Sequence, residues 1–166
     1  MLLDKNMFEC PLHLPIAENL EELRVNNNKF YGTLPNNLYK MRNLKYLEAN
    51  NNQFNGEISR NVGNLTALLW MNLRDNDLSG QIPEEIQSLQ NLEMLRLNYN
   101  YFNGTVPTAI CTSLSGSLRS FYADCKNDLV SGDQYYGIGK PEIECVCCTD
   151  CCDPGKGSDC ERRDLD

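Results

Sequence analysis

The residues with the most distinctive chemistry in this chain are its nine cysteines. A dense cysteine group in a segment without its own apolar core is typical of a disulfide-stapled cap. The run C-V-C-C-T-D-C-C at 145–152 also resembles zinc-ligand spacing, although no histidine lies nearby. Disulfide and metal chemistry therefore both remain open for the clustered cysteines, which are Cys111, Cys125, Cys145, Cys147, Cys148, Cys151, Cys152 and Cys160.

Nothing in the sequence suits catalysis. It contains no nucleophile–base arrangement and no phosphate-binding loop. His13 is the only histidine, and we expect it to be structural. Glu84 and Glu85 follow Pro83, where acidic residues suit the first turn of a helix. We therefore predict a protein that is not an enzyme and that uses no cofactor and no resident metal.

Aromatic and arginine residues could instead serve recognition. Tyr46, Trp70 and Met94 are spaced 24 residues apart. Aromatic side chains beside arginine are typical of binding hot spots, and aromatic faces also stack on sugars. The predicted ligand-binding residues are Tyr46, Trp70, Met94, Arg74, Arg96 and Tyr99. They can act together only if a repeated element brings them to one surface.

The chain contains such a repeat. The segments 19–42, 43–66, 67–90 and 91–114 share the pattern L-x-x-L-x-L-x-x-N-x-[LF]-x-G-x-[ILV]-P, and self-similarity at a fixed period indicates a repeat architecture. In each unit an alternating apolar and polar stretch predicts a half-buried strand. Stacking the units lays these strands in parallel over one continuous core. The predicted inward column is Leu23, Leu47, Met71 and Leu95.

Asparagine at the end of each strand has a predicted structural role. Where the chain turns, an amide side chain can satisfy backbone groups of neighbouring coils. We expect such an asparagine ladder at Asn28, Asn52, Asn76 and Asn100. In the run at 50–52 only Asn52 is then structural, and Asn50 and Asn51 are expected to be exposed and free to vary. Ser59 replaces the proline that ends the other units, a departure that we expect to be tolerated.

Strand alternation also predicts the residues that face outward on the sheet. The four outward columns are Glu22, Tyr46, Trp70, Met94; Arg24, Glu48, Asn72, Arg96; Asn26, Asn50, Arg74, Asn98; and Asn27, Asn51, Asp75, Tyr99. Trp70 is expected to face solvent between Tyr46 and Met94. Arg74 and Arg96 are expected to flank these three residues within reach of cation–π contacts.

The charge and the ends of the chain set further limits. A formal net charge of −8 and a pI of about 4.7 argue against nucleic acid or an anionic membrane as the main partner. Residues 3–12 align with the second half of a unit, so we expect residues 1–18 to be the remnant of a preceding repeat. Cys10 is then either a free thiol or a bridge to an upstream coil. Residues 115–166 are expected to form a last strand and the cysteine-rich cap.

The repeats resemble plant-type leucine-rich repeats, as found in receptor-like kinases, receptor-like proteins and polygalacturonase inhibitors. The ending A-D-C followed by C-V-C-C-T-D-C-C resembles the cap of secreted or membrane-tethered leucine-rich repeat proteins of diatoms and related algae. The resemblance implies a right-handed α/β solenoid with a parallel sheet on the concave face, short helical or 3₁₀ turns on the convex face and a disulfide-rich C-terminal cap. It also favours disulfides over zinc, because this repeat class is secreted.

These patterns predict an extracellular or cell-surface module that binds a protein or peptide through its concave face. A scaffolding subunit, or binding to a glycan or wall polymer, remains an alternative. Ice binding is less favoured, because the column Thr33, Glu57, Gln81 and Thr105 is chemically mixed. Any attachment to a membrane is expected only through an anchor outside this sequence. Sequons at Asn64 and Asn103 suit a secretory route.

The cysteine assignment is testable by mass spectrometry of the unreduced protein. We expect the cysteines from Cys111 to Cys160 to be mainly oxidised, so that alkylation without a reductant labels few of them. Free thiols throughout this segment, or a bound zinc ion in the intact protein, would contradict the assignment.

Overall fold

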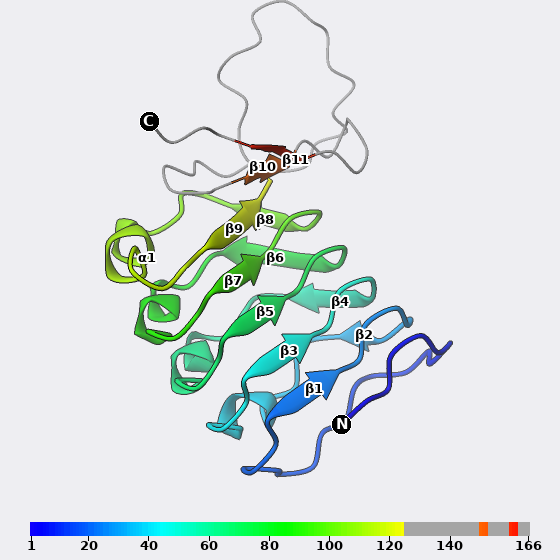
Figure 1. Ribbon diagram of the computed structural model, residues 1–166. Coiled ribbons are helices and arrows are strands. Elements are labelled where there is room, and N and C mark those ends of the chain that lie inside the picture. Colours follow the sequence, from blue (N-terminus) through cyan, green and yellow to red (C-terminus); the bar gives the residue numbers. More distant parts are fainter. Residues whose placement is uncertain (125–149, 153–159, 163–166) are drawn as a thin grey trace, which may run out of the picture.

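The protein is a stack of coils whose main sheet runs the length of the molecule (Figure 1). This computed structural model describes residues 1–124, together with the backbone of 150–152 and 160–162. One strand from each coil contributes to a seven-stranded sheet in the order β1-β3-β5-β7-β9-β10-β11. These strands are β1 Glu22–Arg24, β3 Tyr46–Glu48, β5 Trp70–Asn72, β7 Met94–Arg96, β9 Ser120–Ala123, β10 Asp150–Cys152 and β11 Cys160–Arg162.

The other sides of the coils carry a second parallel sheet and a row of helical turns. The second sheet contains β2 Tyr31–Gly32, β4 Gln53–Gly56, β6 Asp77–Gln81 and β8 Tyr101–Asn103. The helical turns are η1 Leu38–Lys40, η2 Arg60–Asn64, η3 Glu84–Ser88 and α1 Thr108–Ser113. All but α1 are 3₁₀ turns, and Glu84 and Glu85 lie in the first turn of η3 as the sequence predicts. The predicted solenoid fold is confirmed.

The core is built from columns of equivalent residues. The parallel pairing of β1, β3, β5 and β7 places Leu23, Leu47, Met71 and Leu95 in register. These four side chains are at most 2% exposed. Burying one such side chain contributes roughly 1.5–3 kcal/mol, so a column of them holds the coils together. Stacked rings form a second column, with centroids 5.8 Å apart for Phe8 and Phe30 and 6.2 Å apart for Phe30 and Phe54.

The asparagine ladder is present at all four predicted positions. The Nδ2 of Asn76 donates to the carbonyl oxygens of Leu73 and Arg74 in its own coil, at 3.1 and 3.2 Å. It also lies 3.0 Å from the carbonyl of Ala49 in the preceding coil, and its Oδ1 accepts the N–H of Phe54 at 3.0 Å. Each rung therefore joins two coils. Equivalent bonds are made by Asn28, Asn52 and Asn100.

The residue before each ladder asparagine adopts a left-handed conformation. Its φ angle is 56° at Asn27, 56° at Asn51, 55° at Asp75 and 60° at Tyr99. Asparagine and aspartate tolerate this region better than most residues do. The prediction that Asn50 and Asn51 are free to vary is therefore wrong. The backbone of Asn51 requires a residue that accepts positive φ, and Asn50 is half-buried and hydrogen-bonded.

Ser59 replaces proline for a visible reason. Its backbone N–H donates to the Tyr39 hydroxyl at 3.3 Å, and proline has no N–H to donate. The Ser59 hydroxyl also caps η2 by accepting the N–H of Asn61 at 3.2 Å. Burial raises the pKa of Tyr39, and the bond from Ser59 opposes that shift. The departure from the repeat pattern is thus compensated within the turn.

The first residues continue the coil pattern toward the N-terminus. Leu2 forms a parallel bridge with Arg24, and Pro11 forms one with Tyr31. The side chain of Asn6 donates to the carbonyls of Leu3 and Asp4, at 3.1 and 2.9 Å, as a ladder asparagine does within its own coil. Residues 1–18 therefore stack on the first full coil. The proposed domain boundaries stay predictions.

The cysteine-rich segment falls largely outside the described residues. Cys111 in α1 is disulfide-bonded, and Cys10 is exposed with a free thiol. The disulfide-rich cap stays a prediction. The pairing of Cys125, Cys145, Cys147 and Cys148 lies outside the described part. In the backbone, β10 pairs in parallel with β9 and antiparallel with β11. The cap therefore extends the main sheet by two strands, which strand alternation in the repeats did not predict.

Among residues 1–124, 150–152 and 160–162, no helix has the length and apolar character needed to span a bilayer. Within the same residues, no group of three or more His, Cys, Asp or Glu side chains is placed to hold a metal ion.

Removing one ladder rung tests the role of the asparagines. Asn76→Ala should lower the free energy of unfolding by about 2–3 kcal/mol, because it leaves buried carbonyl and N–H groups unpaired. Urea unfolding measures the loss. The matched control is Asn55→Ala, an exposed asparagine in β4 that should change stability by less than about 0.5 kcal/mol. Equal effects from both variants would refute the structural role.

Candidate ligand-binding face

The predicted aromatic column lies on successive strands of the main sheet. Tyr46 pairs with Trp70, and Trp70 pairs with Met94, so their side chains share the outer face. Tyr46 is 38% exposed, whereas Trp70 and Met94 are half-buried. The expectation of a solvent-facing tryptophan is therefore wrong in degree. In the column, Trp70 lies between Tyr46 and Met94.

Trp70 also has an unusual polar environment. Its indole Nε1 is buried, and the described residues offer it no hydrogen-bond partner. Buried indole N–H groups usually find an acceptor, and an unmade hydrogen bond of this kind costs roughly 1–3 kcal/mol. The tryptophan is thus neither a fully exposed anchor nor a satisfied core residue.

At the N-terminal end of the face, one arginine is paired with two carboxylates. Arg24 contacts Glu22 at 2.5 Å and approaches Glu48 on the neighbouring strand at 3.9 Å. The hydrogen bond to Glu22, followed by the charge of Glu48, raises the pKa of Arg24 above its ordinary value. Arg24 is therefore already engaged by carboxylates of its own face.

The other arginines differ from the prediction in their aromatic partners. Arg96 lies over the ring of Tyr122 in β9, 4.8 Å from its centroid, and the described part of the chain gives it no carboxylate partner. Arg74 lies over Tyr99 at 4.8 Å, and its Nε is 3.3 Å from the carboxylate of Asp75. Neither guanidinium stacks on Trp70. Sequence analysis missed Tyr122, because the register from Arg96 spans 26 residues instead of 24.

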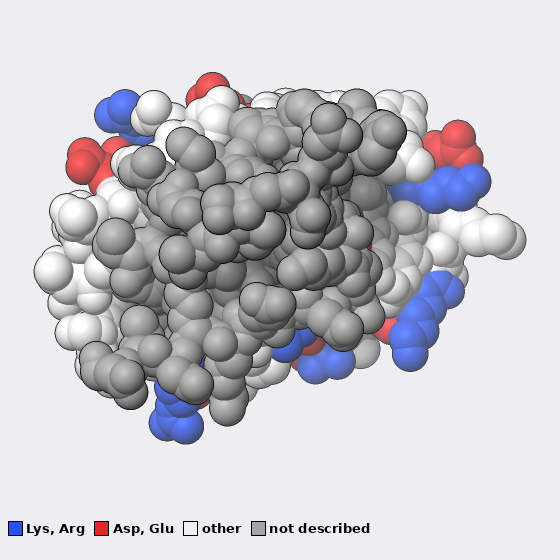
Figure 2. Space-filling model, turned by 90° about the horizontal axis from the view of Figure 1, so that it is seen from above, with Lys and Arg blue, Asp and Glu red and all other residues white. Residues whose placement is uncertain are grey.

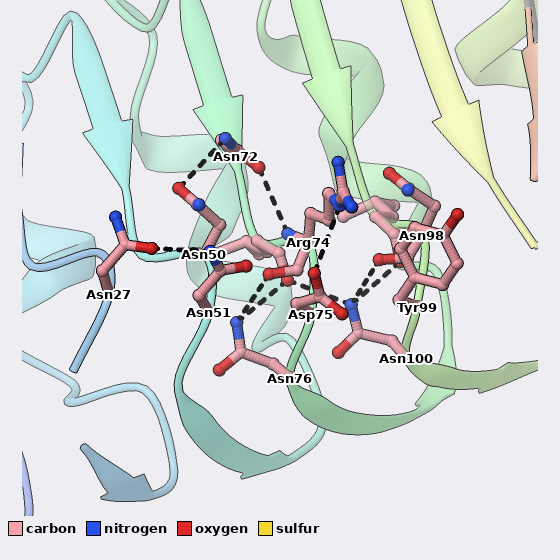
Figure 3. A network of polar contacts seen from close by, with 12 residues as sticks. Asn27, Asn50, Asn51, Asn72, Arg74, Asp75, Asn76, Asn98, Tyr99 and Asn100 are labelled. Carbon is pink, nitrogen blue, oxygen red and sulfur yellow. Dashed lines mark hydrogen bonds and ion pairs between the residues drawn. The ribbon is translucent and has the colours of Figure 1, made fainter. Parts of the chain in front are cut away.

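The third predicted column is more buried than expected. Asn26 is 8% exposed and Asn98 is 1% exposed. Between them, Asn72 donates to the Oδ1 of Asn50 at 3.1 Å and accepts the N–H of Arg74 at 3.3 Å. Figure 3 shows this polar network running across the strand ends toward Tyr99. Asn50 and Asn72 are therefore held by hydrogen bonds, and the column is not a row of freely exposed contact residues.

Asp124 completes the last coil and was not singled out from the sequence. In the earlier coils, the two N–H groups at the strand end donate to backbone carbonyls of the next coil. At the end of the repeats, the N–H groups of Tyr99 and Asn100 donate instead to the Asp124 carboxylate, at 2.8 and 3.0 Å. The carboxylate thus takes the place of the two backbone carbonyls that accept these bonds in the earlier coils. Its sequence signal is the loss of the repeat immediately before Cys125.

The two sequon asparagines lie outside the main sheet. Asn64 ends η2 and Asn103 lies in β8, and both are exposed outside the strands of the main sheet. His13 is also exposed, with its Nδ1 3.0 Å from the carbonyl oxygen of Pro11. Seen from the C-terminal end, the described basic and acidic side chains are mixed around the rim of the molecule (Figure 2).

The family of the protein follows from comparison with known sequences. Residues 19–41, 43–65, 67–89 and 91–113 match the Leucine Rich Repeat family, which covers more than half of the chain. The chain therefore belongs to the leucine-rich repeat family. No curated protein sequence matches it. The resemblance of the cap to algal proteins stays a prediction.

Solved structures place these repeats close to plant ectodomains. The plant peptide hormone receptor RGFR1, in complex with RGF2, matches with a TM-score of 0.66 and 29% identity, over 75% of this chain and 20% of that one. The leucine-rich repeat ectodomain of the membrane receptor kinase GASSHO1/SCHENGEN3 from Arabidopsis thaliana, in complex with CASPARIAN STRIP INTEGRITY FACTOR 2, matches with a TM-score of 0.58 and 34% identity, over 63% of this chain and 12% of that one.

A plant ice-binding protein is also similar, with a TM-score of 0.58 and 25% identity, over 63% of this chain and 33% of that one. The present chain thus spans no more than about a third of the length of any of these three structures. What they share with it is the stack of coils and the parallel sheet.

Replacing the terminal carboxylate tests how the last coil ends. Asp124→Asn should lower the free energy of unfolding by about 1–3 kcal/mol, because an amide NH₂ donor takes the place of one of the two oxygens that accept these N–H groups. Chemical denaturation provides the measurement. Asp77→Asn, at an exposed aspartate in β6, is the matched control and should leave the midpoint unchanged.

An unchanged denaturation midpoint in Asp124→Asn would show that the carboxylate does not hold the last coil.

Proposed function

We propose that the protein is an extracellular recognition module that binds a protein or peptide through the outer face of its main sheet. The face is a rigid surface without any catalytic arrangement among the described residues. Two similar structures are receptor ectodomains solved with bound partners, one of them a peptide hormone receptor. Their shared fold supports a ligand-binding role for this chain.

One observation favours binding at this face over a purely scaffolding role. Ion pairs neutralise Arg24 at the N-terminal end, whereas the described residues leave Arg96 without a carboxylate beside Trp70 and Met94. An arginine that lies over a tyrosine ring, on the same face as other aromatic residues, is characteristic of a hot spot. The binding surface would therefore centre on β3, β5 and β7.

An extracellular location is consistent with this function. Cys111 is disulfide-bonded, and disulfides persist mainly in oxidising compartments. The sequons at Asn64 and Asn103 lie away from the main sheet, so glycans there would leave the proposed binding face clear.

Ice binding is less well supported despite the similar plant structure. The column Thr33, Glu57, Gln81 and Thr105 is exposed on the other side of the coils. Its two middle positions carry a carboxylate and a long amide, so the column is not a flat row of one residue type. Glycan binding would use the same aromatic residues as peptide binding. The selection experiment below distinguishes the two kinds of ligand.

The proposed function can be tested with a peptide-display library selected on the wild-type protein. Trp70→Ala should weaken a selected peptide by at least about 2 kcal/mol, and because Trp70 is half-buried it should also lower the melting temperature. Tyr46→Ala separates the two effects, because Tyr46 is more exposed. Its affinity loss should appear with little change in melting temperature.

The matched control for Tyr46 is Tyr31, in β2 on the other sheet. The two tyrosines are 38% and 43% exposed, respectively. Tyr31→Ala should therefore leave peptide affinity unchanged. Retention of binding by both Tyr46→Ala and Trp70→Ala would refute the proposed face. Selection of glycans instead of peptides, with the same dependence on Tyr46, would assign the face to carbohydrate.

A further inference from the structure

A pocket of about 490 Å³ lies at the edge of the main sheet, where β3, β5 and β7 end. Figure 3 shows Asn51, Asp75 and Tyr99 side by side along this edge, each from a successive coil. The lining residues are Asn51, Asn52, Asp75, Asn76, Asp77, Tyr99 and Tyr101.

The two ladder asparagines in the wall have no amide N–H left to donate to a ligand. Each Nδ2 is shared among three backbone carbonyls, and each Oδ1 accepts a backbone N–H of the preceding coil. Asn52 and Asn76 thus form a fixed wall. Recognition must come from the other side chains of the pocket.

Those other polar side chains present hydrogen-bond acceptors. The Nδ2 of Asn51 donates to the Oδ1 of Asn27 at 2.6 Å, and the Oδ1 of Asn51 remains available as an acceptor. Asp75 is partly neutralised by Arg74, but its side chain is still 45% exposed. Asp77 is exposed, and the described residues provide no cation for its carboxylate. The pocket therefore has an excess of acceptors and of negative charge.

Two tyrosine rings complete the wall. Tyr101 is 37% exposed. Tyr99 has a φ of 60°, and the equivalent residues of the three preceding coils are Asn27, Asn51 and Asp75. A bulky residue in this region is strained, and such strain is concentrated at functional sites. The strain is offset in part because the Tyr99 ring carries the Arg74 guanidinium at 4.8 Å.

We propose that this pocket accepts the basic side chain of an arginine or lysine presented by the protein or peptide partner. Carboxylates and amide oxygens match the donors of a guanidinium or ammonium group, and the Tyr101 ring in the pocket wall adds cation–π attraction. The net charge of −8 favours approach of a basic segment. This inference rests on the proposed recognition function, since it names the chemistry that the partner presents.

The test uses a small probe, so that it does not depend on the partner. N-acetyl-arginine methylamide is titrated into the ¹⁵N-labelled protein at physiological salt, and amide chemical shifts are followed by NMR. Saturable shifts are expected at Asn51, Asp75, Asp77, Tyr99 and Tyr101. The citrulline counterpart has the same shape without the charge, and it should produce much smaller shifts at these positions.

Two variants sharpen the result. Asp77→Asn should weaken the arginine probe about two- to fivefold, the scale of one exposed ion pair. Glu57→Gln removes one exposed carboxylate from the other side of the coils and should leave the affinity unchanged. Equal shifts from citrulline, shifts confined to other residues, or an unaffected Asp77→Asn variant would each overturn the assignment.

Failure of this inference is distinguishable from failure of the proposed function. A library peptide that depends on Tyr46, combined with no arginine response at the pocket, overturns only the pocket assignment. Loss of the Tyr46 dependence overturns the binding face, and it leaves the arginine titration unaffected.

Discussion

The structure depends on one repeated exchange of hydrogen bonds at the strand ends. Each turn out of the main sheet leaves carbonyls and N–H groups that no strand partner can reach, and the amide of one asparagine satisfies them in two coils at once. An amide is suited to this position because it both donates and accepts. The exchange requires the asparagine of each coil to lie beside the turn of the preceding coil. This explains the constant step of 24 residues between Asn28 and Asn100.

The same requirement explains how the repeats end. At Tyr99 and Asn100, the two N–H groups donate to side-chain oxygens in place of backbone carbonyls. Asp124 offers two acceptor oxygens and no donor, so it can complete the last coil but could not serve as an interior rung. Beyond it, β10 and β11 continue the sheet in the backbone. A carboxylate at the end and amides within the stack are thus two solutions to one problem.

The ladder bonds lie at the strand ends, so the side chains on the outer face of the main sheet are not needed for them. In the N-terminal part of the face, Arg24 is paired with carboxylates of neighbouring residues. The C-terminal part holds Trp70, Met94 and Arg96. Tyr99 breaks the local preference for asparagine or aspartate at the strand end. Proteins violate local rules mainly at functional sites, and this violation lies between the proposed binding face and the acidic pocket.

The sequence by itself determined the repeat, the inward columns and the ladder, because each follows from a period and from alternation within a few neighbouring residues. Tertiary structure alone decided the half-burial of Trp70, the stacking of Arg74 and Arg96 on tyrosines, and the role of Asp124. These features depend on contacts between coils more than 20 residues apart. At the last coil the register lengthens to 26 residues from Arg96 to Tyr122, so a constant period could not place them.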